Sequence, residues 1–203
     1  MPTCYRTCLL HAVFCGLVSG AAGAYSAIDP ATLAPPAAAD SAPTGIAYAY
    51  DLSGVNSWDA AGSANNEILS LDVGVPNRFA VRMSWDVSIQ TVGSSWLSEV
   101  TIGFLDSPIG LQLAPGTDDA PGTGTYTSSG IVDLAALDPT FPFEVGPDGI
   151  LQMEVFESFD DEAGAIDAVF LPGSTITFYF IPGPGSAVVL CFAAVCATRR
   201  RRH

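Results

Sequence analysis

Lysine is absent from all 203 residues, and cysteine and histidine are absent from the long stretch between Tyr25 and Pro182. The five cysteines and two histidines all lie before or after that stretch. These absences exclude several centres from it: Ser-His-Asp or Cys-His catalysis, a lysine Schiff base, a P-loop lysine, and a zinc site built from histidine or cysteine. We therefore predict a protein that is not an enzyme.

Positive charge is also scarce in this stretch, which holds two arginines and all 21 acidic residues. The whole chain has a net charge of −14 because the other arginines, Arg6 and Arg199–Arg202, lie near its ends. A surface this acidic repels a phosphate backbone, so the charge pattern argues against a nucleic-acid partner. A domain without cysteine also cannot depend on disulfides.

The first 24 residues have the features of a signal peptide. Arg6 is followed by an apolar run from Cys8 to Val18, and Ala22-Gly23-Ala24 fits the A-x-A cleavage pattern, with Tyr25-Ser26-Ala27 as a second option. The run is too short to cross a bilayer core of ~30 Å. We expect the export machinery to carry the chain out and signal peptidase to remove residues 1–24.

Residues 25–44 are rich in alanine and proline, which is typical of a linker. From Gly45 onward, apolar and polar residues alternate with the period of two that a half-buried strand requires. In the clearest segment, Phe79 to Ile89, alternation assigns one face to be buried. That face carries Phe79, Val81, Met83, Trp85, Val87 and Ile89.

Seven further segments show strand patterns and are separated by Gly-, Pro- and Asn-rich turns. They are Ile46–Leu52, Ile68–Val75 (with Leu69, Leu71 and Val73 buried), Leu97–Leu105, Gly124–Val132, Ile150–Phe159, Ala165–Leu171 and Thr175–Ile181. No helix of ten residues is expected. The pattern predicts an all-β domain over residues 45–181, an antiparallel β-sandwich or jelly roll of about eight strands, flanked by the signal peptide and a C-terminal hydrophobic helix.

Residues 182–203 combine a short proline motif, Pro182-Gly183-Pro184, with twelve mostly apolar residues and the terminal block Arg199, Arg200, Arg201 and Arg202. As a helix, the apolar part spans ~18 Å, which is less than a bilayer core. The arginines should stay cytoplasmic. A plain weak membrane anchor is one interpretation of this tail.

The tail also resembles the PEP-CTERM sorting signal of exosortase-processed bacterial surface proteins, although glycine replaces the glutamate of the Pro-Glu-Pro motif. The resemblance covers about the last 22 residues. It implies an exosortase-like processing enzyme as a partner, transient attachment to the membrane through the C-terminal helix, and a final location at the cell envelope, cell surface or extracellular matrix.

A second resemblance lies in the body of the chain. The strand at Leu97–Phe104, the Ser-Pro-x-Gly turn at Ser107–Gly110, and the late strand at Gly149–Glu157 with Asp160-Asp161 behind it resemble the jelly-roll P-domain that accompanies subtilisin-like proprotein convertases. The tryptophan usual in that late strand is missing here. The resemblance implies a jelly roll and adds no catalytic residue.

Clustered carboxylates are the strongest chemical pattern, because Ca²⁺ takes six to eight oxygen ligands. We predict a calcium site from Glu157, Asp160, Asp161, Glu162 and Asp167, although their spacing fits no EF-hand. Asp118-Asp119 is a second, shorter pair. A solvated acidic loop is the alternative for both clusters.

Carbohydrate chemistry is the other open interpretation. Trp58 and Trp96 lie in or beside predicted turns and could stack on an extracellular polysaccharide, or cap the core. A carboxylate pair drawn from Glu99, Glu154 and Glu157 could serve a polysaccharide-acting hydrolase. Our main prediction is a non-catalytic, exported β-sandwich protein with a structural or ligand-binding role, and the hydrolase is the alternative.

Overall fold

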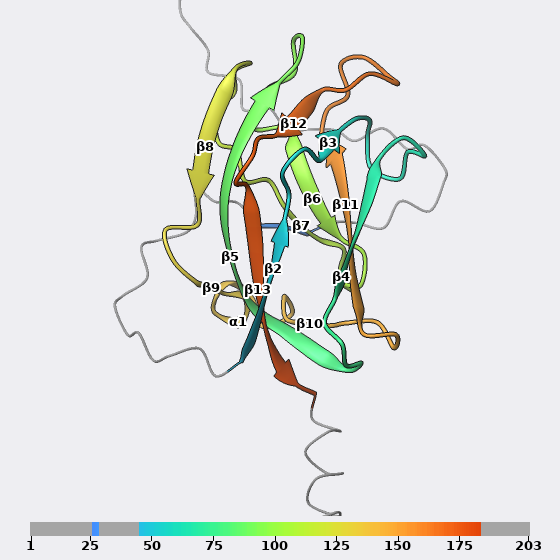
Figure 1. Ribbon diagram of the computed structural model, residues 1–203, viewed down its shortest axis with the longest axis vertical. Helices are drawn as coiled ribbons and strands as arrows, with labels where there is room; N and C mark the ends of the chain where they lie inside the picture. The colour runs from blue at the N-terminus through green and yellow to red at the C-terminus, as the bar shows by residue number, and fades with distance from the viewer. Residues whose placement is uncertain (1–25, 29–44, 184–203) are drawn as a thin grey trace, which may run out of the picture.

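The computed structural model describes residues 26–28 and 45–183, which form two β-sheets packed face to face (Figure 1). The smaller sheet has the strand order β1-β7-β6-β11-β4, and the larger has the order β2-β13-β5-β12-β3. Three short strands, β8, β9 and β10, also pair with β5. All pairs are antiparallel except β1 with β7. The all-β prediction is therefore confirmed.

All eight predicted segments contain a strand, but most bounds differ, and the strand predicted over Gly124–Val132 ends at Thr127, before a separate two-residue strand begins at Val132. The eight strands are β2 (Ile46–Asp51), β4 (Glu67–Asp72), β5 (Arg78–Thr91), β6 (Val100–Phe104), β8 (Thr123–Thr127), β11 (Ile150–Glu157), β12 (Ala168–Phe170) and β13 (Thr175–Pro182). Five further strands have only two or three residues each, too few for a pattern of alternation to show. These are β1 (Ser26–Ile28), β3 (Asn56–Ser57), β7 (Leu111–Leu113), β9 (Val132–Asp133) and β10 (Phe143–Glu144).

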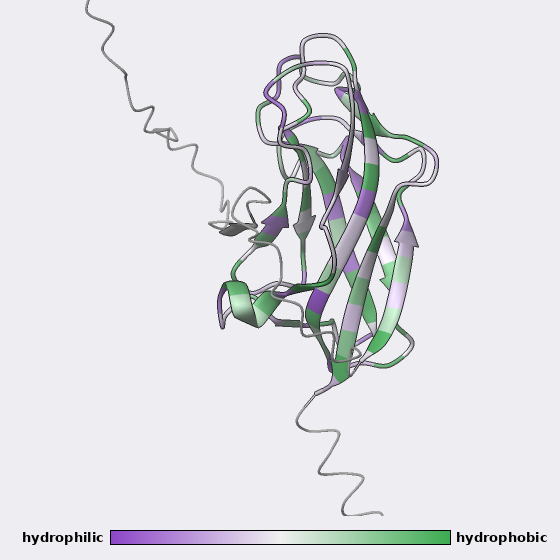
Figure 2. Cartoon of the chain, turned by 90° about the vertical axis from the view of Figure 1, so that its left-hand side faces the viewer, coloured by the Kyte–Doolittle hydropathy of each residue, from purple (hydrophilic) through white to green (hydrophobic). Residues whose placement is uncertain are grey.

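The core lies between the sheets and follows the predicted alternation, which shows as bands of contrasting hydropathy along the long strands (Figure 2). Leu69, Leu71 and Val73 are buried as expected. Phe104 of β6 meets Phe178 of β13 edge to face, with ring centroids 5.5 Å apart, so this pair joins the two sheets.

One part of β5 departs from the predicted alternation. Arg82 pairs with Tyr179 and Ala80 pairs with Phe180, so Val81 is the extra residue of a β-bulge. Beyond the bulge the buried side changes, and Ala80 is buried while Phe79 and Val81 are only partly covered. The prediction that Phe79 and Val81 belong to the buried face is therefore wrong, because a bulge shifts the alternation by one residue.

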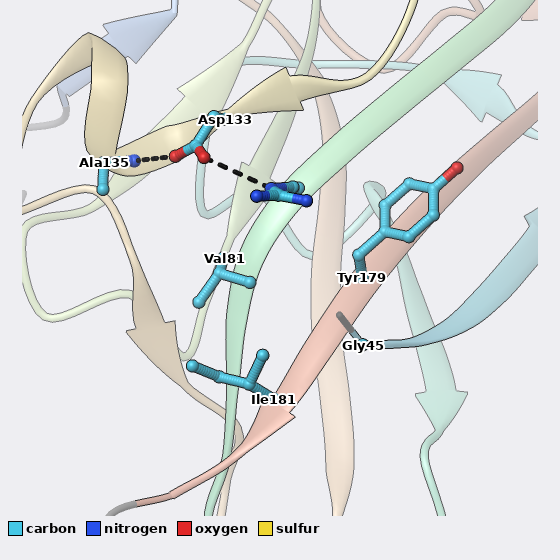
Figure 3. Close-up of a pocket in the computed structure, with 7 residues that line it drawn as sticks. Gly45, Val81, Asp133, Ala135, Tyr179 and Ile181 are labelled. Atoms are coloured by element: carbon cyan, nitrogen blue, oxygen red, sulfur yellow. Dashed lines mark hydrogen bonds and ion pairs between the residues drawn. The ribbon is translucent and has the colours of Figure 1, made fainter. Parts of the chain in front are cut away.

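The bulge turns Val81 toward a shallow pocket of about 250 Å³ on the outer face of the larger sheet (Figure 3). Beside it, Asp133 accepts a hydrogen bond from the amide of Ala135 at 3.1 Å and forms a 3.2 Å ion pair with Arg82. Asp133 thereby caps the short helix α1 (Leu134–Leu137) and fixes it against β5.

Along the described ranges, no helix is long and apolar enough to cross a membrane. The predicted signal peptide at residues 1–24 and the apolar helix within residues 182–203 lie outside the described residues. β1 falls inside the predicted linker at residues 25–44, where it adds a parallel edge strand to β7.

The register of β5 defines two opposite ends of the sandwich. At one end Arg78 pairs with Pro182, and β13 ends there. At the other end Thr91 pairs with Ala168, next to the last residues of β3 and β11. We call this second end the acidic end, because the acidic loop that follows β11 lies there.

Phe178→Ala should lower the free energy of unfolding by about 3–5 kcal/mol, because it removes a fully buried ring at the contact between the sheets. Phe159→Ala is the matched control: Phe159 is 64% exposed, so its removal should change stability by less than about 0.5 kcal/mol. Urea unfolding of both variants tests this prediction. An equal loss of unfolding free energy in the two variants would contradict the burial of Phe178 between the sheets.

Candidate functional site

Four strand ends meet at the acidic end. β3 ends at Ser57 and β11 ends at Glu157, while Glu99 and Asp167 directly precede β6 and β12. Backbone hydrogen bonds join these segments: the amide of Asp167 donates to the carbonyl of Ser57, and the amide of Ser158 donates to that of Glu99, each at 2.9 Å. We call the following set the acidic site: Ser57, Glu99, Glu157, Asp160 and Asp167.

Glu157 is the unusual member of this site. It is only 1% exposed, yet neither carboxylate oxygen has a partner with good hydrogen-bond geometry, and the Ser57 hydroxyl is the one donor that acts on it. Burying a charged group without a partner is strongly unfavourable. A buried acid therefore needs a proton or a cation at this position.

Other buried polar atoms without a partner belong to the same acidic site. Among the described residues, six buried side-chain nitrogen or oxygen atoms lack a partner, and five of the six belong to the acidic site. They are both oxygens of Glu157, Oδ1 of Asp160, Oδ2 of Asp167 and Oγ of Ser57; the sixth is Nε1 of Trp85. Buried polar atoms without a hydrogen-bond partner are rare in folded proteins. Because five of the six found here are oxygens of acidic-site residues, we infer that this site lacks a positively charged partner.

The electrostatics agree with this geometry. Burial raises the pKa of Glu157 to about 8, and the charges of Asp167, Glu99 and Asp161 add to the shift. The Ser57 hydroxyl opposes the shift in part as a hydrogen-bond donor, although its geometry falls short of a good hydrogen bond. Burial likewise raises the pKa of Asp167 and of Glu99, against the hydrogen bonds they accept from Ser95 and from the amide of Trp96. The acids therefore hinder one another's ionisation.

Neighbouring carboxylates show what a satisfied acid looks like in the same fold. Glu154 is also buried, but it accepts hydrogen bonds from the amide of Gly62 at 2.6 Å and from Nδ2 of Asn66 at 2.7 Å. Asp59 accepts from Ser63, Asn65 and the amide of Gly164, and these bonds lower its pKa. The side chains of Glu154 and Asp59 thus fasten loops by hydrogen bonds, whereas the side chain of Glu157 accepts no hydrogen bond from a loop.

Gly164 fastens the acidic loop to this second network. Its φ of +80° lies in the left-handed region that favours glycine, and its amide donates to Oδ1 of Asp59 at 2.6 Å. The loop between Ser158 and Asp167 is thereby held at both ends and at one interior point.

The structure places the predicted metal-ligand residues as follows. Glu157, Asp160 and Asp167 each have a buried oxygen without a partner, and the charge of Asp161 acts on both Glu157 and Asp167. Asp161 and Glu162 themselves are exposed. Sequence reasoning missed Ser57 as a member, and it considered Glu99 only as a catalytic acid. Both lie far away in the chain, and no local motif connects them to the acidic loop.

Oxygen-rich, acid-rich sites suit a hard cation such as Ca²⁺, which tolerates irregular arrangements of six to eight oxygens. In the part of the chain that the structure describes, no three Asp, Glu, His or Cys side chains are already arranged as a set of metal ligands. Carboxylates that repel one another separate when no cation is present. Closing the site around an ion therefore requires side-chain rotation or a small movement of the loop.

The remaining predicted residues are placed as follows. Asp118 accepts from the hydroxyl of Tyr126 at 2.6 Å and Asp119 accepts from Ser98 at 2.8 Å, so this pair is already used in hydrogen bonds. Trp96 is 44% exposed.

Trp58 is half-buried, between Ser57 and Asp59. For the hydrolase alternative, Glu154 is committed to loop 59–66, and Glu157 is shielded from solvent.

Of the sorting motif, Pro182 ends β13 and the amide of Gly183 donates to the carbonyl of Asn77. Pro184 and Arg199–Arg202 lie outside the described residues.

Comparison with known proteins gives little further information. No known protein family matches the chain, and no curated protein matches it, so the two sequence resemblances stay predictions. The chain is similar at a TM-score of 0.30 and 12% identity to the infectious bursal disease virus VP2 subviral particle, over 78% of this chain and 49% of that one. A likeness this weak carries no argument about function.

Without divalent cations, the protein should lose stability as the pH rises from about 5 to 8. The folded state holds the Glu157 proton up to a pKa of about 8, whereas the unfolded state releases it near 4.5, so the folded state binds more protons throughout this window. At about 1.4 kcal/mol per pKa unit, the loss amounts to a few kcal/mol. Urea unfolding in EDTA at several pH values measures it.

Glu157→Gln should remove most of this pH dependence, because the amide cannot ionise. Glu144→Gln, at an exposed position of β10, is the matched control and should keep the wild-type slope. A wild-type protein equally stable at pH 5 and pH 8, or a Glu157→Gln variant with the full slope, would contradict the burial of an unpaired acid.

Proposed function

We propose that this chain is an exported, non-catalytic β-sandwich protein of the cell envelope or extracellular matrix, and that its acidic end binds one Ca²⁺. The observation that carries the proposal is the carboxylate of Glu157, which is buried without a partner of good hydrogen-bond geometry at an end of the sandwich where Asp160, Asp167 and Ser57 also have buried oxygens without partners. A bound cation converts this unfavourable burial into a favourable interaction.

The donor set fits Ca²⁺ better than other ions. Glu157, Asp160, Asp167 and Ser57 would supply five side-chain oxygens, and backbone carbonyls or water can complete six to eight. The described residues contain no histidine or cysteine, which disfavours zinc and copper. Mg²⁺ demands near-ideal octahedral geometry and keeps its water, which an irregular buried cluster does not provide.

The proposed role of the ion is to hold the acidic loop. Asp160 belongs to this loop, whereas Ser57 and Glu157 end strands of different sheets. Ligands from these segments would tie the loop to both sheets at once. The ion would also offset part of the repulsion among 21 acids that face only two arginines in this stretch.

Export, sorting and partners rest on the two ends of the sequence. The proposal assigns residues 1–24 to signal peptidase and residues 182–203 to transient membrane attachment followed by an exosortase-like cleavage. The jelly-roll connectivity belongs to the same proposal. The position of Gly183 is compatible with the proposed membrane attachment. The residue lies at the end of the sandwich opposite the acidic end, so an anchor that begins there would hold the acidic end away from the membrane.

Ca²⁺ should raise the melting temperature of the protein, by an amount equivalent to ~2.7 kcal/mol when its concentration is a hundred times the Kd. Mg²⁺ at the same concentration, and NaCl at matched ionic strength, should give much smaller shifts. Glu157→Gln and Asp160→Asn/Asp161→Asn should lose the calcium-specific shift, while Glu144→Gln keeps it. Thermal melting in each salt checks this, and identical shifts in all salts would leave only a solvated acidic loop.

Mass spectrometry of the protein recovered from the producing cell surface or medium should find neither end of the chain. We expect the mature protein to begin near Tyr25 and to lack Arg199–Arg202, because the ~18 Å apolar helix is too short for permanent spanning. Recovery of a surface protein that retains the arginine block would contradict cleavage at the C-terminus.

A further inference from the structure

Three exposed apolar residues adjoin acids of the acidic end, by sequence or by a backbone hydrogen bond. Among the described residues nine large hydrophobic side chains are exposed, and three of them adjoin acids of this end. Phe159 is 64% exposed and stands directly before Asp160. Trp96 and Val92, 44% and 49% exposed, donate their backbone amides to Oε2 of Glu99 and to the carbonyl of Asp167, each at 2.7 Å.

The two aromatic residues are positioned by the same acid. Glu99 receives the amide of Trp96 on its side chain and the amide of Ser158, next to Phe159, on its backbone carbonyl at 2.9 Å. The loops that carry Trp96 and Phe159 are thus joined through Glu99. Exposed aromatic rings interleaved with carboxylates offer an apolar face and hydrogen-bond acceptors together.

We propose that the acidic end binds a neutral polysaccharide, with the rings of Trp96 and Phe159 stacking on sugar rings and nearby carboxylates accepting hydrogen bonds from sugar hydroxyls. This inference rests on the proposed calcium site, because the ion would add a further restraint on the part of the loop that carries Phe159, between its hydrogen-bonded points at Ser158 and Gly164. Asp160 would bind the ion and directly follows Phe159, so ligation restricts where that ring can lie.

Charge selects against the other partners that an exposed aromatic pair could serve. One Ca²⁺ does not neutralise the acids of this end, Glu99, Glu157, Asp160, Asp161 and Asp167. The remaining negative charge disfavours uronate polymers, nucleic acids and anionic lipid headgroups. In the sequence, Asp160 and Asp161 directly follow Phe159, and Glu99 lies three residues after Trp96, whereas the centre of a protein interface is depleted of charged residues.

The position of Trp96 and Phe159 in the fold also favours a polysaccharide over a lipid surface. The chain leaves the sandwich at Gly183, next to the end where Arg78 pairs with Pro182, whereas Trp96 and Phe159 lie at the opposite end. If the tail attaches to a membrane, the aromatic pair faces away from that membrane and toward the surrounding matrix. A polysaccharide is accessible there, and the lipid surface of the same cell is not.

Affinity electrophoresis of the purified full protein tests this inference. The probes are a soluble β-glucan, a galactomannan and polygalacturonate, each with Ca²⁺ and with EDTA, together with sedimentation on vesicles of phosphatidylcholine and phosphatidylserine. We expect retardation by at least one neutral polymer, in Ca²⁺ only, and no binding to polygalacturonate or vesicles. Trp96→Ala and Phe159→Ala should each weaken retardation about tenfold or more.

Both aromatic variants should keep the calcium-induced melting shift, which separates sugar binding from ion binding. Leu105→Ala is the control, an exposed apolar residue just after β6 that should bind like the wild type. A calcium shift without retardation by either neutral polymer, or retardation unchanged by the aromatic variants, overturns this inference and leaves the calcium site standing. Binding to vesicles that the same variants lose would overturn the polysaccharide inference and indicate a membrane surface as the ligand. Retardation that persists in EDTA, in a protein whose melting temperature Ca²⁺ does not shift, would overturn both the polysaccharide inference and the calcium site.

Discussion

The buried carboxylate of Glu157 is the constraint on which the acidic end depends. Hydrogen bonding accounts for the other deeply buried acid of β11, Glu154, which fastens loop 59–66. Glu157 has the same burial and no such partner. A fold that keeps an acid in this position must supply a proton or a cation, and the two choices have opposite effects on stability as the pH rises.

A cation explains more of the surrounding structure than a proton does. One proton on Glu157 would leave the unpartnered oxygens of Asp160, Asp167 and Ser57 as they are, whereas the proposed ion would satisfy them once the acidic loop closes around it. The ion would also explain why acids are gathered where their charges raise one another's pKa values. Exposed aromatic residues beside the site then form a surface whose shape depends on the ion.

The sequence predicted most of the fold, because a strand with one buried face repeats every two residues and the long strands have enough residues to show it. It could not predict the bulge at Val81, which depends on how β5 pairs with β13, or strands of two or three residues such as β3. The site was predicted where its acids are consecutive, as at Asp160. Ser57 and Glu99 were missed as partners because only the pairing of distant strands brings them to Glu157.

The most direct test of the central claim is X-ray diffraction from crystals grown in millimolar Ca²⁺, with the anomalous signal used to locate the ion. We expect one anomalous peak at the acidic end, ~2.3–2.6 Å from carboxylate oxygens of Glu157 and Asp167. Crystals soaked in EDTA should lack the peak. A well-ordered acidic end with no peak in Ca²⁺, and with Glu157 still unpaired, would show that no calcium site exists there.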